Sequence, residues 1–180
     1  MHRCIAFLRA INVGGRIVKM DALKREFESL GLKRVETFIA SGNVIFESSA
    51  NAASLESKIE KHLAAKLGYE VATFLRTPAE VQSIATYQPF NATAMKNCGA
   101  LVVGFVRAPL VAQSIGLVNA LKSNIDDFHV NGREVYWICK TKQSESKFSN
   151  AVFERTLRAQ ATFRGMNTVK KLAEKYVAGK

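Results

Sequence analysis

A glycine-rich loop near the start of the chain combines backbone freedom with positive charge. Residues 12–19 read NVGGRIVK and lie between a predicted strand and a predicted helix. Backbone amides in such a loop can bind an anion, and here Gly14 and Gly15 supply unusual backbone angles while Arg16 and Lys19 supply charge. Neither Gly-Lys-Ser/Thr nor G-x-G-x-x-G follows, so no specific nucleotide motif is present. A flexible turn is the alternative interpretation.

A second candidate site lies on a predicted helix from about residue 146 to 158. Lys147, Asn150 and Glu154 are spaced by three and four, which places them on one helix stripe. An amine, an amide and a carboxylate together suit binding of a polar ligand or transfer of a proton. Pairs of this kind on a helix surface are also often structural. Ser146 is expected to cap the helix rather than act as a nucleophile.

Arginines form a third group. Arg9 and Arg107 each lie on a predicted strand, on the same face as its apolar residues, so each needs a charged partner or a solvent-exposed strand end. We expect the two to be equivalent and to face one another across a domain cleft, with ion pairs to buried carboxylates as the alternative. Arg164 and Asn167 lie in the last polar turn, where Asn167 or Thr168 is expected to cap the final helix.

Metal and cofactor chemistry has no support in the sequence. His2, His62 and His129 are scattered, and none lies at metal-ligand spacing from a cysteine or another histidine. We therefore expect no metal and no cofactor.

The elements that position these residues follow from hydrophobic periodicity. Strands are predicted at 3–11, 35–40, 44–48, 71–76, 101–107, 128–130, 134–139 and 161–164, and helices at 19–30, 55–67, 77–89, 109–121, 146–158 and 168–177. Thr77 and Glu80 have the spacing of a capping box around Pro78. Residues 91–99 are predicted to be an irregular linker.

The pattern repeats, which indicates an internal duplication. Gly132 takes the place of Gly42 at an offset of 90, and residues 105–107 match residues 7–9 at an offset of 98. The order βαββαβ in each half predicts an α+β protein with two tandem ferredoxin-like (alpha-beta plait) domains. We place the first domain at 1–76, a connecting helix and linker at 77–99, and the second domain, with an extra C-terminal helix, at 100–180.

Composition narrows the class of protein. The chain is 48% hydrophobic and 23% charged, which is typical of a globular protein, and no apolar run reaches the length of a membrane helix. Three widely spaced cysteines predict reduced thiols, and the first apolar run reads as a strand rather than a signal peptide, so we expect a cytoplasmic protein. The net charge is +11, and residues 140–180 hold ten Lys/Arg against three Glu. This bias favours an anionic partner or a solvated basic surface.

Several motifs together resemble a known family. LRAINVGG at 8–15, KMDAL at 19–23, SGNVIFES at 41–48, SKFSNAVFER at 146–155 and RGMNTVKKLAE at 164–174 are similar to the bacterial domain-of-unknown-function family 1697. The resemblance implies a tandem alpha-beta-plait structure and no particular reaction. By position it carries over the polar or glycine residues Arg9, Asn12, Gly14, Gly15, Ser41, Gly42, Asn43, Lys147, Asn150, Glu154, Arg164 and Asn167. The family often has Asn-Trp before its last Asn, where this chain has Gly165-Met166.

These residues lead to one principal functional hypothesis and two alternatives. We expect the polar positions to converge on a basic groove between the two domains that binds an anionic ligand, either nucleic acid or a phosphorylated small molecule. One alternative is a cofactor-independent enzyme in which Lys147 and Glu154 act as acid and base. The other is a structural or dimerisation module. The oligomeric state is left open.

Overall fold

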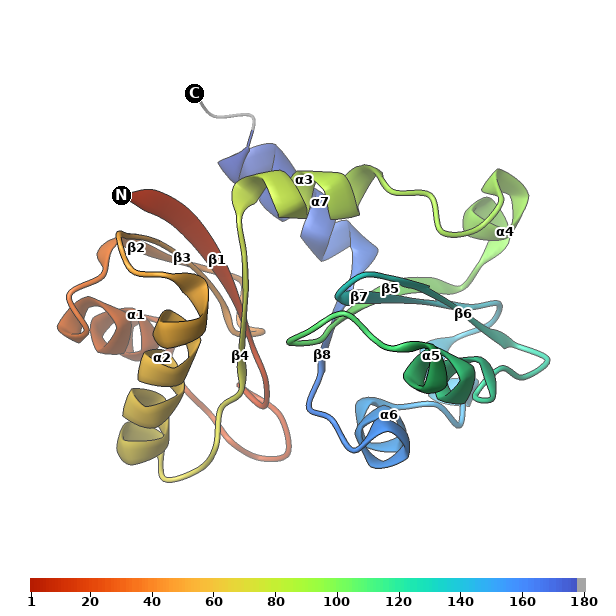
Figure 1. Cartoon of the computed structure of the whole chain (residues 1–180), viewed down its shortest axis with the longest axis horizontal. Coiled ribbons are helices and arrows are strands. Elements are labelled where there is room, and N and C mark those ends of the chain that lie inside the picture. The colour runs from red at the N-terminus through yellow and green to blue at the C-terminus, as the bar shows by residue number, and fades with distance from the viewer. Residues whose placement is uncertain (178–180) are drawn as a thin grey trace. The chain divides into compact units, whose positions relative to one another are not determined.

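The chain forms two compact units, each built on a four-stranded antiparallel sheet (Figure 1). The computed structural model describes residues 1–177. The division falls inside a helix, with Met1–Val81 in the first unit and the chain from Gln82 onward in the second. Over the described residues the protein is mixed α+β, with eight strands and seven α-helices. None of these helices is long and apolar enough to cross a membrane.

The first unit follows the predicted order of strand, helix, two strands, helix and strand. Its sheet has the strand order β2-β3-β1-β4. Its elements are β1 (His2–Leu8), α1 (Met20–Ser29), β2 (Lys33–Phe38), β3 (Asn43–Ser48), α2 (Ala52–Leu67), β4 (Thr73–Arg76) and the start of α3 (Pro78–Thr86).

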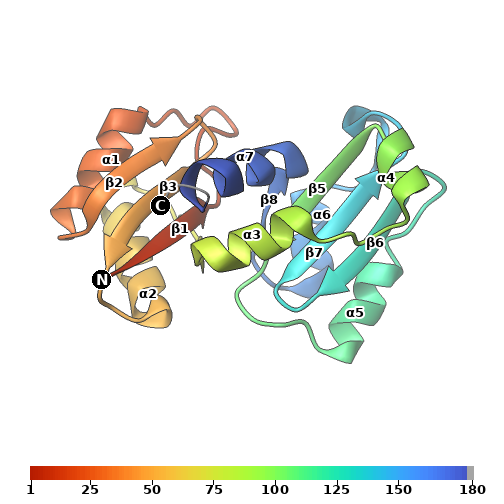
Figure 2. The ribbon, with the colours of Figure 1, turned by 90° about the horizontal axis from the view of Figure 1, so that it is seen from above.

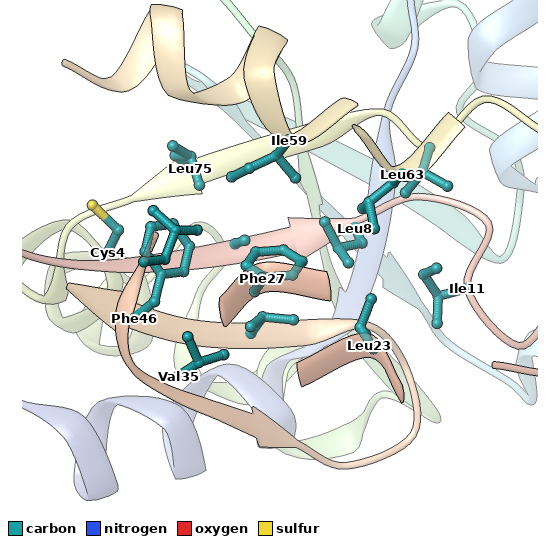
Figure 3. Close-up of a cluster of buried hydrophobic side chains, with 14 of the residues drawn as sticks. Cys4, Leu8, Ile11, Leu23, Phe27, Val35, Phe46, Ile59, Leu63 and Leu75 are labelled. Carbon is teal, nitrogen blue, oxygen red and sulfur yellow. The ribbon is translucent and has the colours of Figure 1, made fainter. Parts of the chain in front are cut away.

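The core of the first unit lies between one sheet face and the two helices α1 and α2 (Figure 3). Phe27 from α1 and Phe46 from β3 lie with ring centroids 5.5 Å apart, and Ile59 from α2 is completely buried. Burial of side chains of this size contributes about 1.5–3 kcal/mol each. The opposite face of β1 is buried as well, because Ile5 and Phe7 have no exposed surface.

The second unit repeats this order and adds helices at both ends. Its sheet has the strand order β6-β7-β5-β8. After the end of α3 come α4 (Ala92–Asn97), β5 (Ala100–Phe105), α5 (Ala112–Asn119), β6 (Asp126–Asn131), β7 (Glu134–Cys139), a 3-10 turn (Gln143–Glu145), α6 (Asn150–Leu157), β8 (Thr162–Gly165) and α7 (Met166–Tyr176). Helix α7 contacts β5 and β8.

Aromatic rings fill the core of the second unit. The ring of Phe148 lies 4.6 Å from Trp137 and 5.7 Å from Phe163, in edge-to-face geometry. Gly104 is required beside them, because a Cβ at this position would lie 2.5 Å from the ring of Phe163. The core of this unit therefore combines large rings with a glycine in the facing strand.

Side-chain caps begin helices α3 and α2. The predicted capping box is confirmed: the Thr77 backbone N–H donates to Glu80 Oε2 at 2.8 Å, and the Glu80 N–H donates to Thr77 Oγ1 at 3.2 Å. Asn51 caps α2 by accepting from the Ser54 N–H at 2.9 Å. These bonds satisfy backbone donors that have no partner inside the helix.

Several element boundaries differ from the prediction, and three of the differences have a visible cause. The first strand ends at Leu8 rather than residue 11, because Ala10 and Asn12 adopt left-handed backbone angles. The predicted linker contains α4, which Asn91 starts by accepting from the Ala94 N–H at 2.8 Å. Helix α7 begins at Met166 with Gly165 at its N-cap, so the expected cap by Asn167 or Thr168 is wrong.

The two hairpin glycines are not equivalent, which corrects the repeat derived from sequence. Gly132 begins a two-residue connection between β6 and β7, whereas Gly42 ends a four-residue connection between β2 and β3. Both have positive φ, +60° and +76° respectively. The strands themselves repeat, because Ile5 pairs with Ile45 and Arg76 just as Val103 pairs with Tyr136 and Arg164.

Replacing Gly42 by alanine tests how tightly the first hairpin packs. A Cβ at Gly42 would lie 2.9 Å from Ile11 Cβ, in addition to the strain of φ +76°. Left-handed strain costs about 1–2 kcal/mol and overpacking about 1–3 kcal/mol, so Gly42→Ala is expected to lower the free energy of unfolding by about 2–5 kcal/mol. Urea denaturation measures this change.

Gly14→Ala is the matched control. Gly14 also has positive φ, +61°, but a Cβ added there would have no neighbouring atom within 4 Å. Only the strain of about 1–2 kcal/mol is expected at this position. Equal losses in the two variants would contradict the packing argument.

Candidate functional site

The Asn12 side chain organises the glycine-rich loop of the first unit. Its Nδ2 donates to the carbonyl oxygens of Val18 and Ala40, at 3.2 and 2.8 Å, and its Oδ1 accepts from the Val18 N–H at 2.6 Å. Asn12 thus closes the loop and ties it to the connection between β2 and β3. Gly14 and Gly15 lie exposed at the far side of this loop, both with positive φ.

Asn43 stabilises the same connection from the other side. Its buried side chain donates from Nδ2 to the Phe38 carbonyl at 3.1 Å and to Ser41 Oγ at 2.9 Å. The structure therefore brings Asn12 and Asn43 together around residues 38–41, where both hold backbone in place. Arg9 follows β1 and is half-buried.

Lys147 does not lie on a helix, which corrects the predicted stripe. Helix α6 begins only at Asn150, because the Ser149 side chain accepts from the Val152 N–H at 3.3 Å and caps it. Lys147 precedes this cap and is exposed. Ser146, the predicted cap, instead donates to both carboxylate oxygens of Asp126, at 2.8 and 2.9 Å.

Asn150 and Glu154 hold the segment that enters β8. Asn150 Nδ2 donates to the Ala161 carbonyl at 3.1 Å, and Glu154 Oε1 accepts from the Ala161 N–H at 2.9 Å. The first unit repeats the second bond, since Glu60 Oε1 accepts from the Thr73 N–H at 2.8 Å. Because a glutamate accepts from a backbone N–H at this position in both units, Glu154 has a structural role. The geometry therefore does not favour Lys147 and Glu154 as an acid–base pair.

Arg164 is buried on β8, three residues after this brace. Its Nη1 donates to Thr162 Oγ1 at 2.8 Å and to the Phe163 carbonyl at 2.9 Å. Burial disfavours the charged form and lowers the pKa of Arg164 to about 10. Arg76 holds the equivalent ladder position in the first unit, is 2% exposed, and donates in the same way to the Leu75 carbonyl at 2.8 Å.

A polar pocket of about 390 Å³ lies in the second unit at the start of α7. This feature, the α7 pocket, is lined by residues from the start of β5, from the turn after β7 and from the first turn of α7. Figure 2 shows α7 beside β5 and β8. The lining includes Cys98, Gly99, Gln143, Met166, Asn167 and Lys170. Of the predicted site residues, Asn167 alone lines this pocket.

Gly99 fixes one wall of the α7 pocket. Its N–H donates to the Cys139 carbonyl at 2.9 Å, and a Cβ at this position would lie 1.9 Å from the carbonyl oxygen of Thr141. No other residue fits this close approach of two backbone segments.

A second pocket, of about 490 Å³, lies between α4 and the β6–β7 part of the sheet. This α4 pocket is lined by Phe90, Asn97, Cys98, Asp127, Ile138 and Lys140, among others. Cys98 lines both pockets and directly follows α4. A third pocket, of about 440 Å³, includes Lys147 and Asp126.

The buried carboxylate of that third pocket is tied to the fold. Asp126 is buried, and it accepts from Trp137 Nε1 at 2.8 Å and from Ser123 Oγ at 2.8 Å, besides the two bonds from Ser146. Asp126 therefore has its hydrogen-bonding capacity largely filled by protein. Over residues 1–177, no three His, Cys, Asp or Glu side chains gather closely enough to hold a metal ion.

The three cysteines are free thiols in different surroundings. Cys4 and Cys139 are buried, while Cys98 is half-buried between the two pockets. Burial, with a smaller effect from the negative charge of Glu80, raises the pKa of the Cys4 thiol. Cys4 is therefore protonated and unreactive at neutral pH.

Sequence reasoning did not place Lys170, Gln143 and the residues around Cys98 in a common site. Lys170 lies within a motif that carried the family resemblance, and its spacing of three from Asn167 places both on one helix face. That spacing is the sequence signal that could have linked Lys170 to Asn167. Nothing in the sequence pairs Gln143 or Cys98 with them, because they come from separate turns.

These observations define a two-unit α+β protein with candidate ligand pockets in its second unit. The chain belongs to the family described as "Protein of unknown function (DUF1697)", which matches residues 1–136. The match ends before α6, β8 and α7, and thus before Gln143, Asn167 and Lys170.

A solved structure is similar over nearly the whole chain. It is the conserved bacterial protein SP0830 from Streptococcus pneumoniae, which is 26% identical, with a TM-score of 0.76 and coverage of 97% of this chain and 98% of that one. The comparison with curated proteins gives no match. The two proteins therefore share the fold of both units, and the comparison assigns no ligand.

Replacing Glu154 separates a structural role from a catalytic one. Glu154→Ala is expected to lower the free energy of unfolding by about 1–3 kcal/mol, because the Ala161 N–H loses its acceptor 2.9 Å away. Glu154→Gln keeps an oxygen acceptor and is expected to retain most of the stability. Thermal or urea denaturation measures both variants.

Lys147→Ala serves as the control, since the exposed side chain of Lys147 lies outside α6. Its free energy of unfolding is expected to change by less than about 0.5 kcal/mol. A stable Glu154→Ala variant would remove the structural interpretation of this carboxylate.

Proposed function

We propose that the second unit binds a phosphorylated small molecule in the α7 pocket. The observation that carries this proposal is the chemistry of the lining: within the described part of the chain, Lys170 is the only charged residue that lines the pocket. The amide side chains of Asn167 and Gln143 add hydrogen-bond donors. A pocket with an ammonium group, amides and no carboxylate suits an anion.

The position of the pocket at the start of α7 supports the same chemistry. Gly165 at the N-cap has no side chain, so it cannot accept a hydrogen bond from the first backbone N–H groups of α7. Helix N-termini favour negative charge through their unpaired N–H groups and the helix dipole. This effect adds to the charge of Lys170 rather than replacing it.

Net charge supports an anionic ligand for the second unit in particular. From Gln82 onward the sequence holds 14 Lys/Arg and six Asp/Glu, whereas Met1–Val81 holds 12 and nine. The second unit thus carries +8 of the total +11. A positive surface raises the local concentration of anions and speeds their association.

The small volume favours a small ligand over a long nucleic acid. Pockets of about 300–1,000 Å³ are typical for small molecules, and the α7 pocket, at about 390 Å³, lies at the lower end of this range. A nucleic acid would instead need an extended basic surface with many phosphate contacts.

We also propose that each unit is a ferredoxin-like plait derived from one duplicated ancestor. The strand orders β2-β3-β1-β4 and β6-β7-β5-β8, the repeated ladder positions of Arg76 and Arg164, and the repeated glutamate brace support this proposal. The cytoplasm is the proposed compartment, and the three free thiols are consistent with it.

Lys170→Ala tests the proposed site. Inorganic phosphate titrated into the full chain is expected to shift the backbone amide resonances of residues 165–170, and the substitution is expected to weaken the phosphate Kd about five- to tenfold. Loss of one charge-assisted hydrogen bond at an exposed site accounts for a change of this size. Two-dimensional NMR titration gives both the site and the Kd.

Lys171→Ala is the matched control, because Lys171 is an exposed neighbour on the same helix that does not line the pocket. It removes the same charge from the surface and is expected to leave the phosphate Kd within about twofold, since exposed charges act weakly at a distance. An equal effect of the two substitutions would mean that only the general surface charge binds phosphate, and the proposed site would be wrong.

A further inference from the structure

We infer that the ligand is a nucleotide, with its phosphate in the α7 pocket and its base in the adjoining α4 pocket. This inference rests on the proposed function and names the class of ligand. Its starting point is that one residue, Cys98, lines both pockets. A ligand with an anionic end and a flat apolar end can occupy the two together.

The walls of the α4 pocket suit a flat aromatic group. Phe90 contributes an aromatic ring to the lining, and the largely buried Ile138 of β7 contributes an apolar side chain. Base-to-aromatic stacking contributes about 1–3 kcal/mol and accepts any base, because every base has a π face. With about 490 Å³, the pocket has room for a base and part of a sugar.

The Phe90 ring is held by other aromatic side chains, which prepares it for stacking. It packs edge-on against His129 with centroids 6.4 Å apart, and His129 Nε2 lies 2.8 Å from Tyr87 Oη. The Tyr87 ring in turn lies 5.1 Å from Tyr136 on β7. A ring fixed by its neighbours loses little conformational freedom when a ligand binds.

Asp127 adds selectivity to the α4 pocket. Its Oδ1 accepts from Lys122 Nζ at 2.7 Å and from the Phe128 N–H at 2.8 Å, which fixes the carboxylate at the pocket wall. Both bonds are made by Oδ1, and neither is made by Oδ2. A carboxylate accepts from the amino group of a base, as from cytosine N4. Asp127 therefore favours a base that carries an amino group.

The two pockets thus differ in what they can hold. Lys170 and the two amides of the α7 pocket favour an anion, whereas Phe90 and Ile138 of the α4 pocket favour a flat group, and Asp127 and Lys140 beside them offer an acceptor and a donor to its polar edge. A nucleoside monophosphate with an amino-bearing base combines both ends in one small molecule. Neither inorganic phosphate nor a free nucleoside uses both pockets.

Titrations of inorganic phosphate, cytidine, CMP and UMP into the full chain test this inference by NMR or calorimetry. CMP is expected to bind at least tenfold more tightly than either phosphate or cytidine, and severalfold more tightly than UMP, which lacks the amino group. Phe90→Ala is expected to raise the Kd of CMP about tenfold and to leave the Kd of phosphate unchanged. Asp127→Asn is expected to reduce the preference for CMP over UMP without changing the phosphate Kd.

Controls and opposing outcomes separate the two levels of the proposal. Phe38→Ala, at a half-buried phenylalanine of the first unit, is expected to leave CMP affinity unchanged, and thermal unfolding checks that each variant is folded. If CMP binds no more tightly than phosphate while Lys170→Ala still weakens phosphate, the nucleotide inference is wrong and the phosphate site stands. If Lys170→Ala has no effect on either ligand, the α7 pocket itself is wrong. Binding of a short oligonucleotide without binding of CMP or phosphate overturns both in favour of an extended surface.

Discussion

The repeated bond from a helix glutamate to the segment entering an edge strand is the constraint on which much of this structure depends. Strands β4 and β8 lie at sheet edges, where a neighbouring strand exists on one side only. Glu60 and Glu154 supply acceptors to the backbone at Thr73 and Ala161, and so attach α2 and α6 to those edges. In the second unit, β8 then leads through buried Arg164 to Gly165 and the first turn of α7. The position of the α7 pocket therefore depends on a carboxylate that lies outside it.

Local sequence signals predicted most of the fold because they act over a few residues. The periodicities of two and of three to four gave the element order, and the capping box at Thr77 and Glu80 formed as expected. The errors came from longer-range choices. The two hairpins have connections of different length, four residues and two, so the match of Gly42 to Gly132 was wrong. The equivalence of the buried Arg76 and Arg164 was not recognised.

The candidate site was harder to predict, because competing hydrogen bonds decide which polar residues are available. Ser149 rather than Ser146 caps α6, and this choice removed Lys147 from the helix face that it was predicted to share with Asn150 and Glu154. The α7 pocket draws its residues from separate turns, so only the short spacing between Asn167 and Lys170 was visible in the sequence. Asn12 and Asn43 were predicted to be ligand-binding residues, and in the structure their amides donate to backbone carbonyls.

Gly99 has a consequence for how this protein can diverge. The backbone at Gly99 lies so close to Thr141 that any side chain would force the connection after β7 away from the start of β5. Gln143 lies two residues beyond Thr141, so the same displacement would move it relative to Asn167. Position 99 thus acts as a sequence marker for this pocket. A relative with another residue there has to build this wall differently.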